Sequence, residues 1–540
     1  MKFGVAAALL FFIQVITARP ATTPIGQLRK QIKDKHRSSL LRRDVDPTIL
    51  YPAYNLSVPV DHFHNESEYA PHSNEKFNLR YWFDASYYQE GGPVVVLESG
   101  EADGTERLPY LQKGIVAQLI KATGGLGVIL EHRYYGTSIP TPDLSTKNLR
   151  FLTTEQAMAD VAYFVQNVEF QGVNKTLTAP ETPYIMYGGS YAGAFVAFLR
   201  VKYPQLFWGA ISSSGVTKAI YDYWEYYEPI REFAPPDCIL ATQQLTNVVD
   251  NILLGSKSLS QIAELKTTFG LGSVTDNRDF ANLLSFGIGN WQGRNWDPDV
   301  NDPSFFYYCQ NLTAADALYP TTLPLTLKVK DITDAGGYED NEALQTQMLN
   351  WIGYVNLTVV STCEGETQDE CFTNLNATFY EQDGIDQQSW RSWSYQYCTQ
   401  WGYIQTGSGV PHNILPLISR TLDLNYLTTV CRDAFNITNP PDVEAVNKYG
   451  GFDIHYPRLA IIGGQADPWR PATPLADKAG KRKSTTSQPV LEIPDAVHHW
   501  DENGLFPNET TPTLPPNAIV YAQQFEKDFV LEWMKEWNDQ

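Results

Sequence analysis

The chain has 540 residues, of which 61 are acidic and 40 are basic, and its formal net charge at pH 7 is −21. This length suits one large domain with an insertion, or two domains. A protein with this much negative charge repels nucleic acids and anionic membrane surfaces. We therefore expect neither as a partner.

The first 43 residues are predicted to be removed in two steps. Residues 1–18 have a basic start and an apolar run too short to span a membrane, which is typical of a secretory signal peptide. Residues 19–43 are polar and basic and end in Arg42 and Arg43, which predicts a pro-segment; the alternative is a disordered basic tail. Residues 1–43 hold nine Lys/Arg and one acidic residue, so their loss takes the net charge from −21 to −29. We therefore expect a secreted, extracellular protein.

Sequons for N-glycosylation agree with secretion, because their acceptor asparagines are modified only in the secretory pathway. The candidate sites are Asn55, Asn65, Asn174, Asn311, Asn356, Asn376, Asn436 and Asn508.

Residues 44–220 alternate between strand and helix patterns and form the first part of a predicted α/β-hydrolase domain. Residues 93–97 and 126–130 are continuous apolar runs typical of buried strands, and a helix is expected from Thr153. Alternation of this kind predicts a mostly parallel sheet with helices on both faces.

A candidate nucleophile lies where another predicted strand meets a helix. Residues 184–187 are apolar, and residues 188–193 read Gly-Gly-Ser-Tyr-Ala-Gly. A serine on a sharp strand-to-helix turn is exposed to a base, and the next backbone N–H points toward a developing oxyanion. Ser190 and the N–H of Tyr191 are the candidates for these roles; the alternative is an ordinary glycine-rich turn.

Residues 221–449 lose the alternation and are predicted to form a helical cap over the carboxyl edge of the sheet. All six cysteines lie in this insertion, and their even number indicates disulfides rather than a redox or zinc site. Our favoured pairing is sequential: Cys238 with Cys309, Cys363 with Cys371, and Cys398 with Cys431.

Residues 450–540 form the second part of the hydrolase domain and supply an acid and a base. Residues 458–462 read as a strand that leads to Asp467, and residues 489–493 as a strand that leads to His498 and His499. Nucleophile, acid and base follow in this order in α/β-hydrolases. Either histidine could be the base, with His412 as a further candidate. No third ligand at a suitable spacing accompanies the pair, so we expect no metal and no cofactor.

Several motifs in this order resemble the prolyl-specific serine peptidases, a family that includes lysosomal Pro-X carboxypeptidase, dipeptidyl-peptidase II and fungal acid prolyl endopeptidases. The motifs are Asp61-His62-Phe63, residues 131–136, residues 152–157, Gly188-Gly189-Ser190-Tyr191, Asp467-Pro468-Trp469 and the loop of His498. The resemblance runs from about residue 54 to the C-terminus. It implies a capped α/β-hydrolase that cleaves peptides or proteins after proline, often in acid, with Ser190 as nucleophile, Asp467 as acid and His498 as base.

Further site residues are expected around this triad. The second oxyanion donor is predicted in the loop after residues 93–97, at Glu101. Trp469 could line an apolar slot for the proline ring, or could simply be packed in the core. The chain departs from the family pattern at three positions: Ala192 for glycine, Gln400 for glutamate, and Trp500 for an aliphatic residue.

Three other functions compete with this interpretation. A broader serine carboxypeptidase of the carboxypeptidase Y type carries a glutamate where this chain has Gly189. A capped esterase or lipase and a hydrolase-fold binding protein without activity are the others. The sequence leaves open whether a peptidase of this kind acts at the ends of a peptide or internally, and what its oligomeric state is, a homodimer included.

Overall fold

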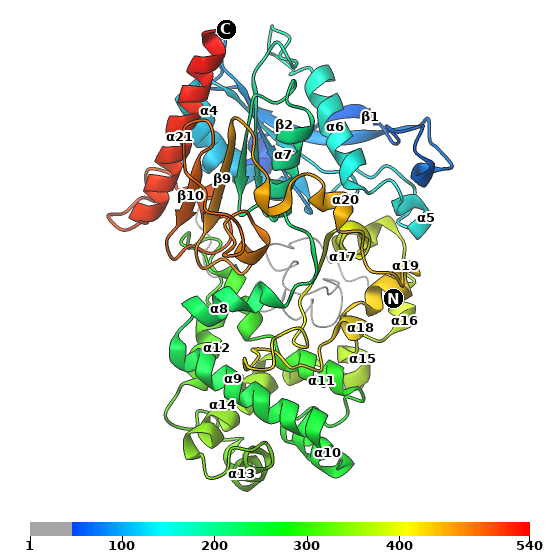
Figure 1. Ribbon diagram of the computed structural model, residues 1–540, viewed down its shortest axis with the longest axis vertical. Helices are drawn as coiled ribbons and strands as arrows, with labels where there is room; N and C mark the ends of the chain where they lie inside the picture. Colours follow the sequence, from blue (N-terminus) through cyan, green and yellow to red (C-terminus); the bar gives the residue numbers. More distant parts are fainter. Residues whose placement is uncertain (1–45, 257) are drawn as a thin grey trace.

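The computed structural model describes residues 46–256 and 258–540, and Figure 1 shows a sheet-containing part and a helical part. The predicted signal peptide, residues 1–18, and the predicted pro-segment, residues 19–43, lie outside the described residues. None of the helices in the described part of the chain is long and apolar enough to cross a bilayer.

The sheet-containing part is built on an eight-stranded sheet with the strand order β1-β2-β4-β3-β5-β6-β9-β10. The strands are β1 (Tyr54–Pro59), β2 (Lys76–Asp84), β3 (Val94–Glu98), β4 (Leu126–Leu130), β5 (Tyr184–Gly189), β6 (Gly209–Ser213), β9 (Leu459–Gly464) and β10 (Val490–Ile493). β2 pairs antiparallel with β1 and β4, and all other pairs are parallel. The mostly parallel sheet of an α/β-hydrolase is therefore confirmed.

Helices cover both faces of this sheet, which explains its apolar strands. Every residue of β3 is buried. Val94 and Val96 face one hydrophobic cluster, whereas Val95 and Leu97 face the other. Parallel strands buried on both faces have such continuous apolar runs.

Four helices supply most of this cover. α6 (Thr154–Asn167) and α7 (Tyr191–Lys202) contribute to the cluster on one face, and α4 (Ile115–Thr123) and α21 (Asn517–Asn538) contribute to the cluster on the other. The sheet is thus the middle layer of three, and its carboxyl edge is left for the loops that carry the site.

The insertion between β6 and β9 is helical, as predicted, and lies at one end of the sheet (Figure 1). Its helices are α8 (Glu228–Phe233), α9 (Pro236–Asp250), α10 (Leu259–Thr268), α11 (Asn277–Leu284), α12 (Ser304–Leu312), α13 (Thr326–Ala335), α14 (Glu342–Thr358), α15 (Gln368–Phe372), α16 (Ala377–Tyr380), α17 (Gln388–Gln396), α18 (Leu424–Leu427), α19 (Thr429–Phe435) and α20 (Glu444–Asn447). A short parallel pair, β7 (Ile220–Asp222) and β8 (Gly402–Ile404), joins its beginning to its later part.

Three disulfides cross-link this insertion, in the sequential pairing favoured from the sequence. Cys238 pairs with Cys309, Cys363 with Cys371, and Cys398 with Cys431. The first joins α9 to α12 and closes the longest loop, of 71 residues. Cross-links of this kind restrict the unfolded chain and so favour the folded cap.

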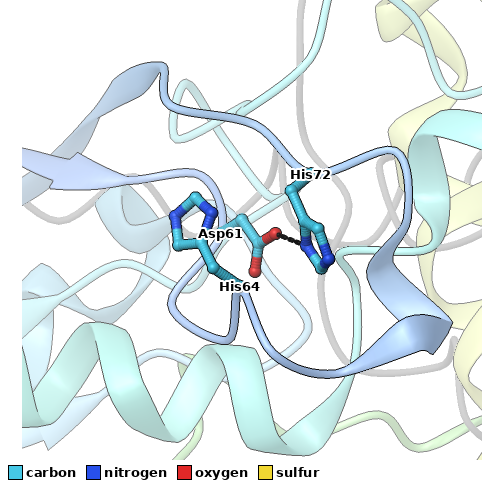
Figure 2. A group of neighbouring side chains, drawn as sticks. All are labelled: Asp61, His64 and His72. Carbon is cyan, nitrogen blue, oxygen red and sulfur yellow. Dashed lines mark hydrogen bonds and ion pairs between the residues drawn. The ribbon is translucent and has the colours of Figure 1, made fainter.

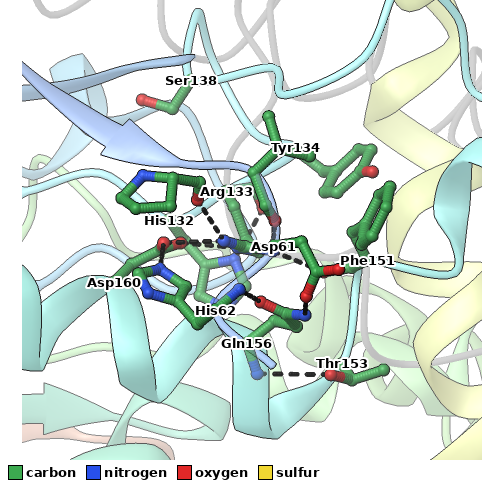
Figure 3. A network of polar contacts seen from close by, with 12 residues as sticks. Asp61, His62, His132, Arg133, Tyr134, Ser138, Phe151, Thr153, Gln156 and Asp160 are labelled. Carbon is green, nitrogen blue, oxygen red and sulfur yellow. Dashed lines mark hydrogen bonds and ion pairs between the residues drawn. The ribbon is translucent and has the colours of Figure 1, made fainter. Parts of the chain in front are cut away.

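A buried ion-pair network fixes the segment after β4 against α6 and the segment after β1 (Figure 3). The Arg133 guanidinium is fully buried and contacts both Asp160 oxygens, with Nε and Nη2 at 2.5 and 2.7 Å. His62 Nε2 lies 2.8 Å from the same carboxylate. Burial alone would raise the pKa of Asp160, but Arg133 and His62 hold it below its usual value. The charged groups are thus paired, as buried charges require.

Candidate active site

Ser190 lies on a strained turn between β5 and α7. Its backbone is left-handed, with φ 61° and ψ −124°, and its N–H donates to the Ser213 carbonyl on β6 at 2.9 Å. A Cβ atom at Gly188 would lie 2.2 Å from the Ala192 carbonyl oxygen, and one at Gly193 would lie 2.7 Å from the Ser213 carbonyl oxygen. Because both contacts are with backbone, the turn requires glycine at these two positions. This is the geometry of a nucleophile elbow.

The predicted acid and base meet at the carboxyl ends of β9 and β10. His498 Nδ1 lies 2.8 Å from Asp467 Oδ2 and 3.0 Å from Oδ1. Asp467 Oδ1 also accepts a hydrogen bond from the Trp469 N–H at 2.9 Å, which fixes the carboxylate. An ionised carboxylate can only accept, so Nδ1 carries the proton and Nε2 has the free lone pair of a base.

His498 Nε2 is buried and has no hydrogen-bond partner, so no hydrogen bond joins it to Ser190 in this conformation. Catalytic hydrogen bonds are often long before substrate binds. Burial lowers the pKa of His498 more than the Asp467 carboxylate raises it, so the imidazole stays neutral below its ordinary range. Ser190, Asp467 and His498 are 7%, 1% and 5% exposed, respectively, so all three are buried.

His499 has a different environment from His498. Its Nδ1 lies 2.8 Å from Glu502 Oε2, and its backbone N–H donates to Ser214 Oγ at 3.0 Å. Burial would lower the pKa of His499, but Glu502 raises it above the ordinary value. The structure therefore places His498, and not His499, against Asp467.

The His499 ring also occupies the space in front of Gly189. A Cβ atom at Gly189 would lie 3.1 Å from His499 Cγ and 3.4 Å from Glu502 Oε2. A glutamate at this position, as in the carboxypeptidase Y type, would have to displace a buried ion pair. The sequence singled out Gly189 but did not predict that His499 and Glu502 fill the space that a glutamate side chain would take there.

The loop after β3 packs against the start of α7, where an oxyanion hole would form. Gly100 has φ 67°, and a Cβ atom there would lie 3.3 Å from Ala192 Cβ. The Gly100 N–H donates to Glu98 Oε2 at 2.7 Å, and the N–H of the next residue, Glu101, the predicted second oxyanion donor, is hydrogen-bonded to its own carboxylate. Burial raises the pKa of Glu98 to about 8 and also raises the pKa of Glu101.

The Tyr191 side chain connects the elbow to the cap. Burial lowers the pKa of His132 to about 4, and its Nδ1 lies 2.7 Å from the Arg133 carbonyl. The neutral ring therefore donates from Nδ1 and accepts at Nε2 from the Tyr191 hydroxyl at 2.9 Å. That hydroxyl in turn accepts from Gln396 Nε2 of α17 at 2.9 Å. No motif in the sequence pointed to Gln396, because the contact spans 205 residues.

Trp469 is 1% exposed and belongs to an aromatic cluster between the acid loop and the cap. Its ring stacks on Tyr223 at 5.3 Å, and its Nε1 donates to Gln292 Oε1 at 2.8 Å. The ring centroid is 6.3 Å from that of His498. These contacts support the packing alternative, with the indole as a rigid wall near the base.

Gln400 joins the cap to the first turn of α6. Its Oε1 accepts from the N–H and the hydroxyl of Thr154, both at 3.0 Å, and its Nε2 donates to Glu155 Oε2 at 3.2 Å. An ionised glutamate at this position would lie beside the Glu155 carboxylate. The glutamine therefore keeps the helix cap and avoids that repulsion.

The candidate glycosylation sites fall into two groups. Asn55, Asn65, Asn174, Asn376, Asn436 and Asn508 are exposed, whereas Asn311 and Asn356 are half-buried. The Asn311 and Asn356 side-chain amides each donate to a backbone carbonyl of their own helix at 2.7 Å. Glycosylation at all eight positions remains a prediction.

Comparison with known proteins is consistent with this geometry. Residues 58–514 match the model of the family "Serine carboxypeptidase S28". The chain is 53% identical over 534 residues to a probable extracellular serine carboxypeptidase of Arthroderma benhamiae, covering 98% of this chain and 74% of that protein. It is 25% identical to the thymus-specific serine protease of Mus musculus, covering 99% of each. It is 27% identical to the serine protease vicPa of Bipolaris victoriae, covering 79% of this chain and 80% of that one. The chain therefore belongs to the serine carboxypeptidase S28 family and is a serine-type peptidase.

Proposed function

We propose that this protein is a secreted peptidase in which Ser190 is the nucleophile, His498 the general base and Asp467 the residue that orients the base. The observation that carries the proposal is the 2.8 Å contact between His498 Nδ1 and Asp467 Oδ2, with Nε2 left free. Ser190 supports it because its left-handed turn is the one that exposes a nucleophile.

The reaction follows from these groups. His498 Nε2 takes the Ser190 proton as Oγ attacks the carbonyl carbon, and the N–H groups of Tyr191 and Glu101 stabilise the resulting oxyanion. His498 then gives the proton to the leaving amine, and water hydrolyses the acyl-enzyme by the same steps. Loss of one oxyanion donor costs about 2.7–4 kcal/mol of barrier.

Secretion is supported by features that do not depend on the site. Three disulfides persist in an oxidising compartment, and the Arthroderma relative is named as extracellular. The predicted signal peptide and sequons agree.

Cleavage after proline is the finer part of the proposal. The sequence resemblance carries it, because Trp469 and Tyr223 are buried against each other and present no exposed ring face to a proline. Proline loses little conformational entropy when it binds, because its φ angle is already fixed. A broader carboxypeptidase is less favoured, since His499 and Glu502 occupy the space at Gly189.

Substitutions at the triad should separate chemistry from folding. We expect Ser190→Ala, Asp467→Asn and His498→Ala each to lower kcat on the order of 10⁴-fold or more, with the native circular dichroism retained. His499→Ala should be milder, because His499 contacts Glu502 rather than Asp467. An inactive His499→Ala enzyme beside an active His498→Ala enzyme would reverse the assignment of the base.

Specificity should be tested with peptides that differ only in the residue before the cut bond. We expect proline to give the highest kcat/KM, because its fixed φ angle means that little conformational entropy is lost on binding. Mass spectrometry of the products from peptides with free and blocked ends reports both the preference and the mode of attack. Equal cleavage after alanine, leucine and proline would contradict the proline proposal, and ester hydrolysis without peptide hydrolysis would favour an esterase.

The enzyme should remain active in acid and should reach its highest activity below the pH at which Glu98 ionises. His498 must be neutral to act, and its pKa is lowered, so kcat/KM should rise with pH through a midpoint below about 6.5. Glu98 is protonated below its pKa of about 8, and its ionisation places a negative charge beside the oxyanion donors. Activity should therefore fall above neutral pH.

The variant Glu98→Gln tests the origin of this alkaline limb. It keeps a side chain of the same shape but cannot ionise, so the fall in kcat/KM should move to higher pH while the acid limb stays. The measurement is a pH profile of kcat/KM from about pH 3 to about pH 9 for both enzymes. A wild-type rate that still climbs past neutral pH would contradict the acid optimum.

A further inference from the structure

Two histidines and an aspartate lie together outside the active site, in the segment between β1 and β2. Asp61, His64 and His72 each offer one ligand atom, and these atoms lie within 4.8 Å of one another. Figure 2 shows the Asp61 carboxylate between the two imidazole rings, whose centroids are 5.5 Å apart. All three residues come from one loop segment of twelve residues, from Asp61 to His72.

Hydrogen bonds from its own loop and from α6 hold the Asp61 carboxylate in place. Its Oδ1 accepts from the Phe63 N–H at 2.9 Å and from Gln156 Nε2 at 2.8 Å, and its side chain is fully buried. Burial would raise the pKa of Asp61, but these hydrogen bonds and the neighbouring His72 and His64 lower it below its usual value. The group is therefore an oriented anion, and its Oδ2 faces His72 Nδ1 at 2.7 Å.

The two histidines complete this set from the solvent side. His64 and His72 are both exposed, so an ion can reach them without opening the fold. Two imidazoles and one carboxylate are a donor set that suits zinc and its neighbours in the first transition series, and water can fill the fourth position. The contact between Gln156 and Asp61 is the kind of outer hydrogen bond that orients a metal ligand.

We propose that Asp61, His64 and His72 bind one divalent transition-metal ion of the zinc class. The ion would replace the direct hydrogen bond between Asp61 and His72 and close the loop between His64 and His72. A plain ion pair between Asp61 and His72 is the competing interpretation.

Such an ion would stabilise one wall of a cavity of about 800 Å³ that lies apart from Ser190. Glu66, Glu68 and Tyr69 line this cavity and lie between the two histidine ligands in the chain. The same segment contains the short helix η1 (Ser67–Tyr69). A bound ion restricts this loop in the native state only, so it raises the unfolding temperature.

The test is zinc binding to the untagged, metal-free protein at neutral pH. Isothermal titration calorimetry with Zn²⁺ measures stoichiometry and affinity, thermal unfolding with and without Zn²⁺ measures the linked stabilisation, and Mg²⁺ serves as the ion that this donor set disfavours. The variants are His64→Gln and His72→Gln, which keep the exposed surface polar. His412→Gln is the matched control, because His412 is also exposed but lies outside the cluster.

We expect one Zn²⁺ per chain and a rise in unfolding temperature with Zn²⁺ but not with Mg²⁺. His64→Gln and His72→Gln should each lose affinity by at least about 10-fold, since loss of a ligand costs no less than loss of a ligand's hydrogen-bond partner. The His412→Gln protein should behave as the wild type. Absence of Zn²⁺ binding, or binding of unchanged affinity in both cluster variants, would show that Asp61 and His72 form only an ion pair.

Discussion

The turn at Ser190 can close only because Gly188 and Gly193 have no side chains. Each lies against a backbone carbonyl at a distance that no Cβ atom could occupy, so β5 and α7 approach more closely here than side chains would permit. The left-handed Ser190 then lies at the carboxyl edge of the sheet. The acid and base loops end at this same edge because β9 and β10 run parallel to β5. The close packing of this turn and the parallel order of the strands together bring Ser190, Asp467 and His498 to one edge of the sheet.

The two neighbouring histidines are both buried, but their pKa values are shifted in opposite directions. The lowered pKa of His498 keeps it neutral, whereas Glu502 favours the charged form of His499. The same environment keeps Glu98 protonated into the neutral range. A site in which Glu98 stays neutral and the His498 base stays unprotonated is suited to acid, although the protein carries a large net negative charge. Local burial outweighs the overall charge.

The sequence was most informative about candidate site residues that come shortly after a predicted strand. The apolar runs before Ser190, Asp467 and the pair His498 and His499 predicted these candidates, the family resemblance selected His498 from the pair, and the structure brings Asp467 and His498 into contact. The elements β1 and β2 were missed, although Lys76–Asp84 alternates between exposed and buried residues at its start, because this short period-two pattern carries less signal than a continuous apolar run. Contacts such as those of Gln292, Gln396 and Gln400 depend on how the cap folds back across more than a hundred residues, and no local pattern reports that.

The central claim is that Ser190 is the nucleophile activated by His498, and covalent labelling tests it directly. A fluorophosphonate reacts with an activated serine, and peptide mapping by mass spectrometry locates the adduct. The account predicts a single adduct on Ser190, formed together with loss of peptidase activity, and a much slower reaction in His498→Ala. An adduct on another serine, or full peptidase activity in a protein quantitatively labelled at Ser190, would contradict it.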